Sequence, residues 1–419
     1  MSYNRFCFCL IFICILSNAM PVRLCAQSKS LDNYITAGLQ NSPLLKEINN
    51  NILLNHIDSL RILATYQPQV NGVSYNYAAP VVHGFGYDGG ISNVYNVSEQ
   101  VSATQLLVSK RSLRIQFNGI QLLNDSLSIA GKITGQDVKR TITAAYIAAY
   151  GSWRQYSFDK EVYDLLSAED TVLKKLAQAS VYRQTDYLTF LVTLQQQHLL
   201  ITQAKIQYQS DFATLNYVSG LFDTTFVPLD SPRIEITQLP EMNASIFYQK
   251  FTVDSLLLQN AGRRIDLSYR PKITLGADAG YVSSFVYTPY KNWGASANVN
   301  VIVPIYDGKQ RKLSHKRLDI LENTRANYRD FFATQYKQQI AQLTQQLNST
   351  KTLIAETANQ LKYVRALIVA NSKLLATGDV RIADYVIAIN NFLNAQNVVI
   401  QNTVAQFQII TQINYWNRR

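Results

Sequence analysis

The chain has 419 residues, of which 47% are hydrophobic, and it carries a formal net charge of +11 and four cysteines. All four cysteines lie within residues 1–26, a segment that we expect to be removed, so the mature chain would hold neither disulfides nor thiolate metal sites. Basic stripes can indicate nucleic-acid binding, but the basic residues here are dispersed along long helical stretches. In an exported chain, that dispersal favours solvated helix faces and no nucleic-acid partner.

The N-terminus has the pattern of a secretory signal peptide. Arg5 precedes an apolar run at residues 6–16, and Ala26 is a small residue suited to cleavage. The run is too short to cross a bilayer as a helix. We therefore predict a signal peptide over residues 1–26. Lipidation of Cys25 is the alternative, although the residues ahead of Cys25 fit a lipoprotein signal poorly.

Short sequence patterns occur twice in the chain, in the same order and about 200 residues apart. This period is far longer than that of a solenoid, so we predict two domain-sized halves that pack as pseudo-equivalent partners. The halves would be residues 27–220 and 245–419, and residues 221–244 would form an irregular linker with short strands. The matching pairs are 66–70 with 269–273, 105–108 with 304–307, 186–188 with 384–386, and 215–217 with 413–415.

Each half is predicted to contain one helix, two strands and two long helices. In the first half, apolar residues at helical spacing predict one helix that begins at Ser30 or Asp32 and ends near Ala64. Strands follow at about 69–82 and 94–108. We expect Val73, Tyr75 and Tyr77 on the first strand to face outward together with Val97, Val101 and Ala103 on the second. Glu99 has the same parity as this apolar set, which weighs against a membrane barrel.

The strands of the second half, at about 271–286 and 293–306, alternate cleanly between apolar and polar residues. This pattern fits a half-buried sheet, and it also fits a membrane barrel with lipid outside and water inside. Tyrosines and Trp293 on the strands and their loops fit an aromatic girdle or ordinary strand propensity. The apolar face would carry Ile273, Leu275, Ala277, Ala279, Tyr281, Phe285, Ala295, Ala297, Val299, Val301, Val303 and Ile305.

Residues 109–226 and 307–419 contain no proline and carry only narrow apolar stripes. Such stretches are typical of coiled coils or helical arrays that bury a thin seam against neighbours. Each stretch is interrupted near its middle. Gly378 predicts a helix C-cap before a new helix begins near Ala383, and residues 179–186 form the counterpart without a glycine. Both interruptions are predicted to be turns between antiparallel helices, far from the strands.

The signal peptide, the repeated helix–strand–strand–helix–helix order, the Pro-x-hydrophobic entry to each first strand, and the runs at 303–308 and 375–379 together resemble the TolC family of outer-membrane efflux ducts. The resemblance covers residues 27–419. It implies a mainly α-helical homotrimer in which each chain gives four strands to a shared 12-stranded transmembrane β-barrel. The helices would form a periplasmic tunnel, which opens when a periplasmic adaptor and an inner-membrane pump dock.

The resemblance also suggests a periplasmic constriction at the second helix turn. Asp384 matches an inward-facing acidic position of the family, and three such carboxylates would favour cations. Ile387 stands where the family can carry a second acid, so no double ring is expected. A gating role for Arg381 is a hypothesis, because the residue lies one position from the family's basic latch. For Asp384, and more so for Asp186, the alternative is an acid that stabilises a helix dipole.

No enzyme motif, cofactor fingerprint or metal-site spacing is present in the sequence. We therefore predict a passive duct in the outer membrane that exports small toxic molecules, with the energy supplied by the pump. An exit duct for type I protein secretion is the alternative within the family. A periplasmic helical scaffold or adaptor is the alternative of another class, and a cell-envelope hydrolase would need a convergent acid/base site that the sequence does not show.

Overall fold

The computed structural model describes residues 29–88, 95–236, 242–284 and 288–416. The predicted signal peptide, Cys25 and Phe285 lie outside these residues. The chain divides into two compact units. The hairpin unit contains the residues up to Asn41, Thr141–Ile234 and Thr352–Gln408. The sheet unit contains Ser42–Arg140, Glu235–Lys351 and Ile409–Arg419.

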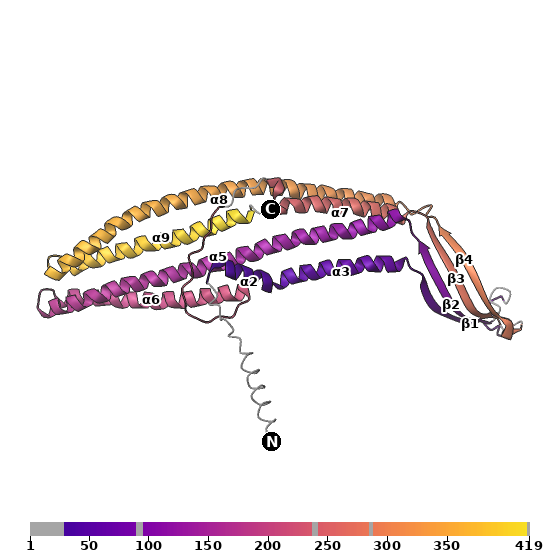
Figure 1. The fold of residues 1–419 in the computed structure, drawn as a ribbon, viewed down its shortest axis with the longest axis horizontal. Helices are drawn as coiled ribbons and strands as arrows, with labels where there is room; N and C mark the ends of the chain where they lie inside the picture. The colour runs from indigo at the N-terminus through magenta and orange to yellow at the C-terminus, as the bar shows by residue number, and fades with distance from the viewer. Residues whose placement is uncertain (1–28, 89–94, 237–241, 285–287, 417–419) are drawn as a thin grey trace, which may run out of the picture. The chain divides into compact units, whose positions relative to one another are not determined.

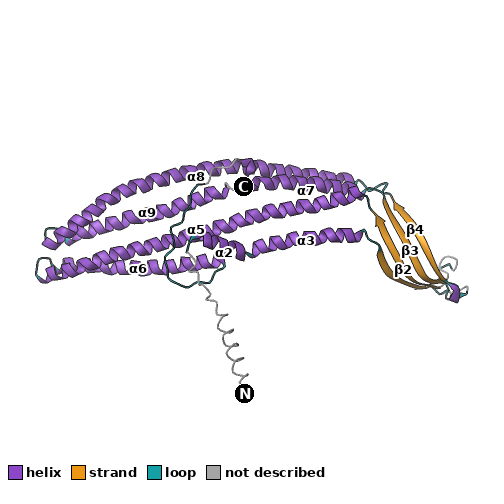
Figure 2. Cartoon of the chain, in the orientation of Figure 1, coloured by secondary structure: helices purple, strands orange, loops and turns teal. Residues whose placement is uncertain are grey.

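The chain is mainly helical with one four-stranded sheet (Figures 1 and 2), as expected from the sequence. The order of helix, two strands, a long helix and a shorter helix occurs twice. No helix in the described ranges is both long enough and apolar enough to span a bilayer. In chain order the elements are α2 (Leu31–Asn41), α3 (Pro43–Thr65), β1 (Gln69–Ala78), β2 (Tyr95–Leu107), α5 (Lys110–Gln178), α6 (Gln184–Ser219), η1 (Met242–Ala244), α7 (Ile246–Ser268), β3 (Lys272–Ser283), η2 (Pro289–Lys291), β4 (Trp293–Ile302), α8 (Gln310–Thr377) and α9 (Ile382–Trp416).

The single helix predicted between residue 30 and Ala64 is wrong, because the chain forms two helices there. Ser42 separates α2 from α3 with φ −58° and ψ 115°, which is outside the helical region. Pro43 explains the break: its ring disfavours helical geometry at the preceding residue, and its missing N–H suits the first position of a new helix. Pro43 therefore ends one helix and begins the next.

The sheet has the strand order β1-β2-β3-β4, and every neighbouring pair is antiparallel. Figure 1 shows the four strands side by side, with β1 and β4 at the two edges. An edge strand presents a row of unpaired backbone N–H and C=O groups. The chain therefore ends its sheet with two open edges, and the four strands do not close on themselves.

Register gives the sheet one apolar and one polar face across β3 and β4. Leu275 lies opposite Val299 and Ile273 opposite Val301, while Thr274 lies opposite Asn300. Side chains at directly opposed positions share a face. The apolar face continues onto β2, where the register places Val101 opposite Ala279 and Ala103 opposite Ala277.

The prediction for β1 is wrong. Its register pairs Val73 with Gln100, Tyr75 with Ser98 and Tyr77 with Asn96. These three side chains therefore lie on the polar face, opposite to the face of Val97, Val101 and Ala103. The apolar face of β1 instead carries Val70, Gly72, Ser74, Asn76 and Ala78.

The strand predicted at 293–306 ends earlier, at Ile302, so Val303 lies just beyond it. The ladder pairs Lys272 with Ile302, and its next pair would be Pro271 with Val303. Proline has no N–H to donate, so the pairing stops there. The same proline entry that marks the start of β3 in the sequence thus also fixes the end of β4.

The hairpin unit buries one apolar cluster along its helices. In Figure 1, α6 runs beside the later part of α5, and α9 beside the later part of α8. Apolar residues at helical spacing line these contacts. The fully buried members include Leu166 and Leu173 on α5, Phe190 on α6, Leu375 on α8, and Tyr385, Ala388 and Ile389 on α9.

The linker contains no strand within its described residues, 221–236 and 242–244, which corrects the short strands predicted there. Its carbonyl groups are satisfied by side chains instead of a ladder. The Tyr208 hydroxyl donates to the Val227 carbonyl oxygen, and Asn216 Nδ2 donates to the Asp223 carbonyl oxygen at 2.8 Å. The Tyr146 hydroxyl lies 2.7 Å from the Asp230 carbonyl oxygen. Buried tyrosines thus hold the linker against the hairpin unit without regular structure.

Candidate functional site

Two helix turns in the hairpin unit carry the residues that the sequence singled out. The second turn follows α8. Gly378 has φ +84°, its N–H donates to the Leu375 carbonyl oxygen, and the Asp379 N–H donates to the Leu374 carbonyl oxygen at 2.9 Å. This pair of bonds is a Schellman motif. The glycine that predicts a helix C-cap here does occupy the left-handed position.

The first turn has the same geometry without a glycine. Ser180 has φ +61°, its N–H donates to the Ala177 carbonyl oxygen, and the Val181 N–H donates to the Leu176 carbonyl oxygen. A left-handed backbone is costly for a residue with a Cβ atom. Ser180 therefore holds a strained position that Gly378 holds without strain in the second turn.

Tyr182 links the two turns. Its hydroxyl lies 2.9 Å from the carbonyl oxygens of both Leu375 and Val380, so its one proton is shared between them. Burial raises the pKa of Tyr182, and the charge of Asp379 adds to the effect. Sequence reasoning missed this residue. The available signal was an aromatic side chain in a turn composed otherwise of small and polar residues.

Asp384 and Arg381 form an ion pair at the start of α9. Arg381 Nε donates to one carboxylate oxygen at 2.9 Å and Nη2 donates to the other at 3.0 Å. This bidentate contact and the charge of Asp384 raise the pKa of Arg381. The side chains are 83% and 36% exposed, respectively. Asp384 therefore carries a compensated charge, which the sequence alone did not indicate.

Asp186 lies in the first turn of α6, at the position that matches Asp384 in α9. It is exposed, and the described part of the chain gives it no ion pair. The Asp186 N–H donates to the Arg183 carbonyl oxygen at 3.1 Å. The two turns thus have similar backbones and different charges, with a free carboxylate in one and a paired carboxylate in the other.

A buried layer supports the second turn from behind. Tyr385 is fully buried, and its hydroxyl has no hydrogen-bond partner among the described residues. Burial raises the pKa of Tyr385, with a smaller contribution from Glu169. The Ser372 hydroxyl donates to Glu169, and Asn371 Nδ2 donates weakly to the Asp384 carbonyl oxygen at 3.4 Å. These contacts join α5, α8 and α9 within the hairpin unit.

The second candidate region is the apolar face of the sheet. The side chains of Val299, Val301 and Val303 are 67%, 55% and 53% exposed, respectively, in the single chain. On the same face, Val70 and Val101 are also exposed. An exposed apolar patch of this kind marks a surface that contacts lipid or protein.

A cross-strand row near the loop end of the sheet combines polar and aromatic side chains. Ser74 lies opposite Glu99, Glu99 opposite Tyr281, and Tyr281 opposite Trp293. The Ser74 hydroxyl donates to the Glu99 carboxylate at 2.7 Å, and Asn76 Nδ2 donates to it at 3.1 Å. The Tyr281 and Trp293 rings are 5.6 Å apart. Glu99 thus lies level with the aromatic pair, away from the apolar middle of the face.

Comparison with solved structures identifies the fold. CusC, studied for folding and transmembrane channel formation, matches with a TM-score of 0.73 and 10% identity over 94% of this chain and 93% of that chain. The Campylobacter jejuni CmeC outer membrane channel gives 0.72 and 10%, over 92% of this chain and 85% of that chain. The Vibrio cholerae outer membrane protein VceC gives 0.71 and 11%, over 93% and 96%.

No protein-family model and no curated protein sequence matches the chain. The likeness is therefore one of structure over nearly the full length of both partners, at identities where sequence is almost unrelated. The chain has the fold of these channels, which confirms the mainly helical chain with a four-stranded sheet that the TolC resemblance implied.

Proposed function

We propose that this chain, which has the fold of outer-membrane channels, is one subunit of a trimeric passive channel. The sheet would cross the outer membrane, and the helices would extend into the periplasm as a tunnel. The observation that carries the proposal is a sheet with one exposed apolar face, an aromatic row at one end and two open edges. A sheet of that kind cannot be stable alone in water or in lipid.

The dimensions of the apolar face support a membrane position. From Trp293 to Val303 the chain covers about 33 Å at about 3.3 Å per residue. A tilt of about 40° reduces this to about 25 Å, which is the height of the apolar band of outer-membrane barrels. In this position the row of Glu99, Tyr281 and Trp293 lies at the membrane–water interface. Glu99 is therefore compatible with a membrane barrel, because its carboxylate is hydrogen-bonded and would lie at the membrane–water interface.

The open edges support a trimer. In lipid, every strand edge must be paired, because no water is present to satisfy its backbone groups. Pairing β4 of one copy with β1 of the next satisfies both edges of each chain. Three copies of a four-stranded sheet give the 12-stranded barrel that the resemblance implied.

We extend the proposal to the internal organisation and the partners. Residues 27–220 and 245–419 would be pseudo-equivalent halves joined by 221–244, and the elements occurring twice in the same order support this. The helix turns would meet a periplasmic adaptor, and an inner-membrane pump would supply the energy. Small toxic molecules are the proposed cargo, with a secreted protein as the alternative.

At the turns we propose a constriction whose charge is set by Arg381 and Asp384 together. Three inward-facing carboxylates would form a cation-favouring ring. The bidentate contact from Arg381 reduces that field at each copy. Asp186 would contribute a second, uncompensated ring only if its turn also faces the lumen.

Fractionation of cells that express the full chain tests the main proposal. We expect the protein in the outer-membrane fraction, extractable by detergent as a trimer, and able to form conducting pores in planar bilayers. Recovery from a periplasmic extract without detergent would contradict the barrel and support a soluble helical scaffold. Detergent-dependent recovery without conductance would contradict the channel role alone.

A further inference from the structure

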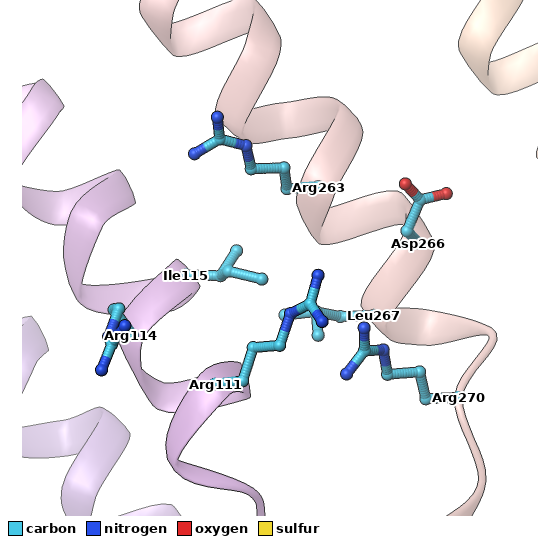
Figure 3. A pocket seen from close by; sticks show the side chains of 7 residues that line it. All are labelled: Arg111, Arg114, Ile115, Arg263, Asp266, Leu267 and Arg270. Carbon is cyan, nitrogen blue, oxygen red and sulfur yellow. The ribbon is translucent and has the colours of Figure 1, made fainter.

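A cavity of about 550 Å³ lies in the sheet unit between the first turns of α5 and the last turns of α7. Figure 3 shows that the guanidinium groups of Arg111 and Arg270 point toward each other across it, beside Leu267. Arg111 is exposed and Arg270 is half-buried, so water screens the repulsion between the two charges only in part. The residues that line the cavity are Arg111, Arg114, Ile115, Arg263, Asp266, Leu267 and Arg270.

The positive charge of the cavity is uncompensated within the described residues. Asp266 is its only acidic residue, and that carboxylate already accepts hydrogen bonds from Arg311 at 2.8 Å and contacts His315 at 3.0 Å. The hydrogen bond from Arg311, followed by the one from His315, lowers the pKa of Asp266. The described part of the chain gives no ion pair to any of the four lining arginines.

The start of α5 adds to the positive field. Ser109 caps this helix, since the Ser112 N–H donates to the Ser109 hydroxyl oxygen at 3.2 Å. The first turn contains no acidic residue, and it contains Lys110 and Arg111. Helix N-termini carry partial positive charge and favour acids, so basic residues here oppose the usual preference. An anion between the helix end and the arginines would reduce this repulsion.

A second cavity of about 600 Å³ adjoins the first and shares Leu267 and Arg270 with it. This second cavity is lined in part by Leu106, Leu107 and Val108, where β2 ends. Lys272, the first residue of β3, and Pro271 complete the side toward the sheet. The second cavity is mixed, because Arg264, Arg270 and Lys272 line it together with these apolar residues. The pair of cavities therefore places an apolar strip, Leu106 to Val108, within a largely cationic surface at the junction of helices and strands.

We propose that Arg111 and Arg270 bind the phosphate group of an anionic ligand in this cavity, assisted by Arg114 and Arg263. Arginine forks bind phosphate oxygens in pairs of hydrogen bonds, which suits this geometry. Resting on the proposed membrane position of the sheet, the junction lies at the level of lipid headgroups. An anionic phospholipid, with its acyl chains against Leu106, Leu107 and Val108, is one source of that phosphate. A soluble phosphate compound is the other.

The test measures ligand binding by the detergent-solubilised full chain. The probes are a short-chain phosphatidylglycerol, the matching phosphatidylcholine, and inorganic phosphate. For a lipid site we expect phosphatidylglycerol to bind at least about tenfold more tightly than either other probe. The double substitution R111Q/R270Q should weaken that binding by about tenfold or more, because charged hydrogen bonds are lost. For a soluble ligand, inorganic phosphate should bind as tightly as phosphatidylglycerol and show the same loss.

Matched variants make the result specific. K316Q/R317Q removes the same charge from exposed residues of α8 that do not line the cavity, and it should leave binding unchanged. Equal binding by wild type and R111Q/R270Q overturns the inference, as does equal loss in K316Q/R317Q. If R111Q/R270Q fails to fold, the single substitution R270Q serves instead and should weaken binding in the same direction. Outer-membrane fractionation and conductance of the same proteins are measured in parallel. Failure there contradicts the proposed function, whereas normal conductance without anion preference contradicts only this site.

Discussion

Ser180 and Gly378 occupy equivalent left-handed positions in the two helix turns. Only Gly378 adopts a positive φ without strain. Ser180→Gly should therefore raise stability by about 1 kcal/mol, because it removes the cost of a Cβ atom at positive φ. Gly378→Ala should lower stability by about 1–2 kcal/mol, because the new Cβ would also lie 2.9 Å from Val181 Cγ1. Thermal unfolding of the solubilised protein measures both. A destabilising Ser180→Gly would show that the serine hydroxyl matters more than the backbone.

The Arg381–Asp384 pair leads to a prediction about ion selectivity. If the pair faces the lumen, Asp384→Asn should weaken cation selectivity, and Arg381→Gln should strengthen it by exposing the carboxylate. Neither change should alter stability by more than about 1 kcal/mol, because the pair is exposed. Reversal potentials in bilayer recordings measure the effect. Unchanged selectivity in both variants would leave Asp384 as a helix-terminal acid, since asparagine serves that role almost as well.

Asp223 gives the hairpin unit a defined sensitivity to acid. Burial alone would raise the pKa of Asp223, but hydrogen bonds from Lys29 and Thr225 and the charge of Lys29 lower it to about 2. A depressed folded-state pKa stabilises the protein above the ordinary value of about 3.9. That contribution, about 2 kcal/mol at most, is lost as pH falls from about 4 toward 2.

Asp223→Asn should therefore flatten the fall of melting temperature across this pH window, and it should lower the melting temperature at neutral pH. Asp186→Asn is a control in the same unit, because that carboxylate is exposed and forms no ion pair within the described residues. Its melting temperature should fall in acid as steeply as that of wild type. An Asp223→Asn profile that falls as steeply as wild type would assign the acid sensitivity to other groups.

Single residues differ in how far the sequence predicts them. Gly378 is predictable because its conformational role follows from its own chemistry. The ion pair of Asp384 with Arg381 is less predictable, because exposed side chains choose among several partners at similar cost. Tyr182 is not predictable, because its partners are carbonyl groups about 193 and 198 residues away along the chain.

At the scale of elements, β4 offers the sharpest test of the membrane face. Val299 lies nearest the middle of the apolar run between Trp293 and Val303, whereas Val301 lies closer to the strand end. Val299→Arg should cost about 2–4 kcal/mol of membrane stability, because it places a charge toward the bilayer middle. The matched variant Asn300→Arg projects from the opposite face and should be mild. Trimer yield in detergent measures both, and equal yields would show that the Val299 face does not meet lipid.

The strands also show what periodicity can and cannot predict. In β3 and β4 the apolar face was correct, since alternation within each strand is a local property. In β1 the face was wrong, because Val73, Tyr75 and Tyr77 alternate equally well on either side. Only the register with β2 decides, and a shift of one residue exchanges the faces. On the face that β1 shares with Val101, Ser74 and Asn76 donate hydrogen bonds to the Glu99 carboxylate.

In the helices, as in the strands, local features were predictable from the sequence and features that depend on a neighbouring residue were not. The ends of α6 and α8 follow from Gly220 and Gly378, which take the left-handed conformation just after each helix. The break between α2 and α3 was missed because the apolar spacing continues across it, whereas Pro43 acts on the backbone of Ser42. Periodicity reports which side of a helix is buried and is insensitive to a one-residue interruption.

At the scale of the whole molecule, the order of elements and the lengths of the helices, together with the TolC resemblance, were sufficient to predict a mainly helical chain with a four-stranded sheet. They sufficed because few architectures combine proline-free helical stretches with short amphipathic strands. The arginine cavity was not predicted, because its members come from separate helix ends, at residues 111–114 and 263–270. Their convergence depends on how α5 and α7 pack within the sheet unit.

The contact of Tyr182 with the second turn has a consequence for motion. One hydroxyl proton spans the carbonyl groups on both sides of Gly378, and Val181 packs on that glycine. The two turns of one chain are therefore joined by this contact and should move together as one rigid body. In a trimer, dilation of the tip would then involve three moving parts instead of six. In the proposed trimer, the hinge of each part would then lie away from the turns, and neighbouring copies would slide past one another.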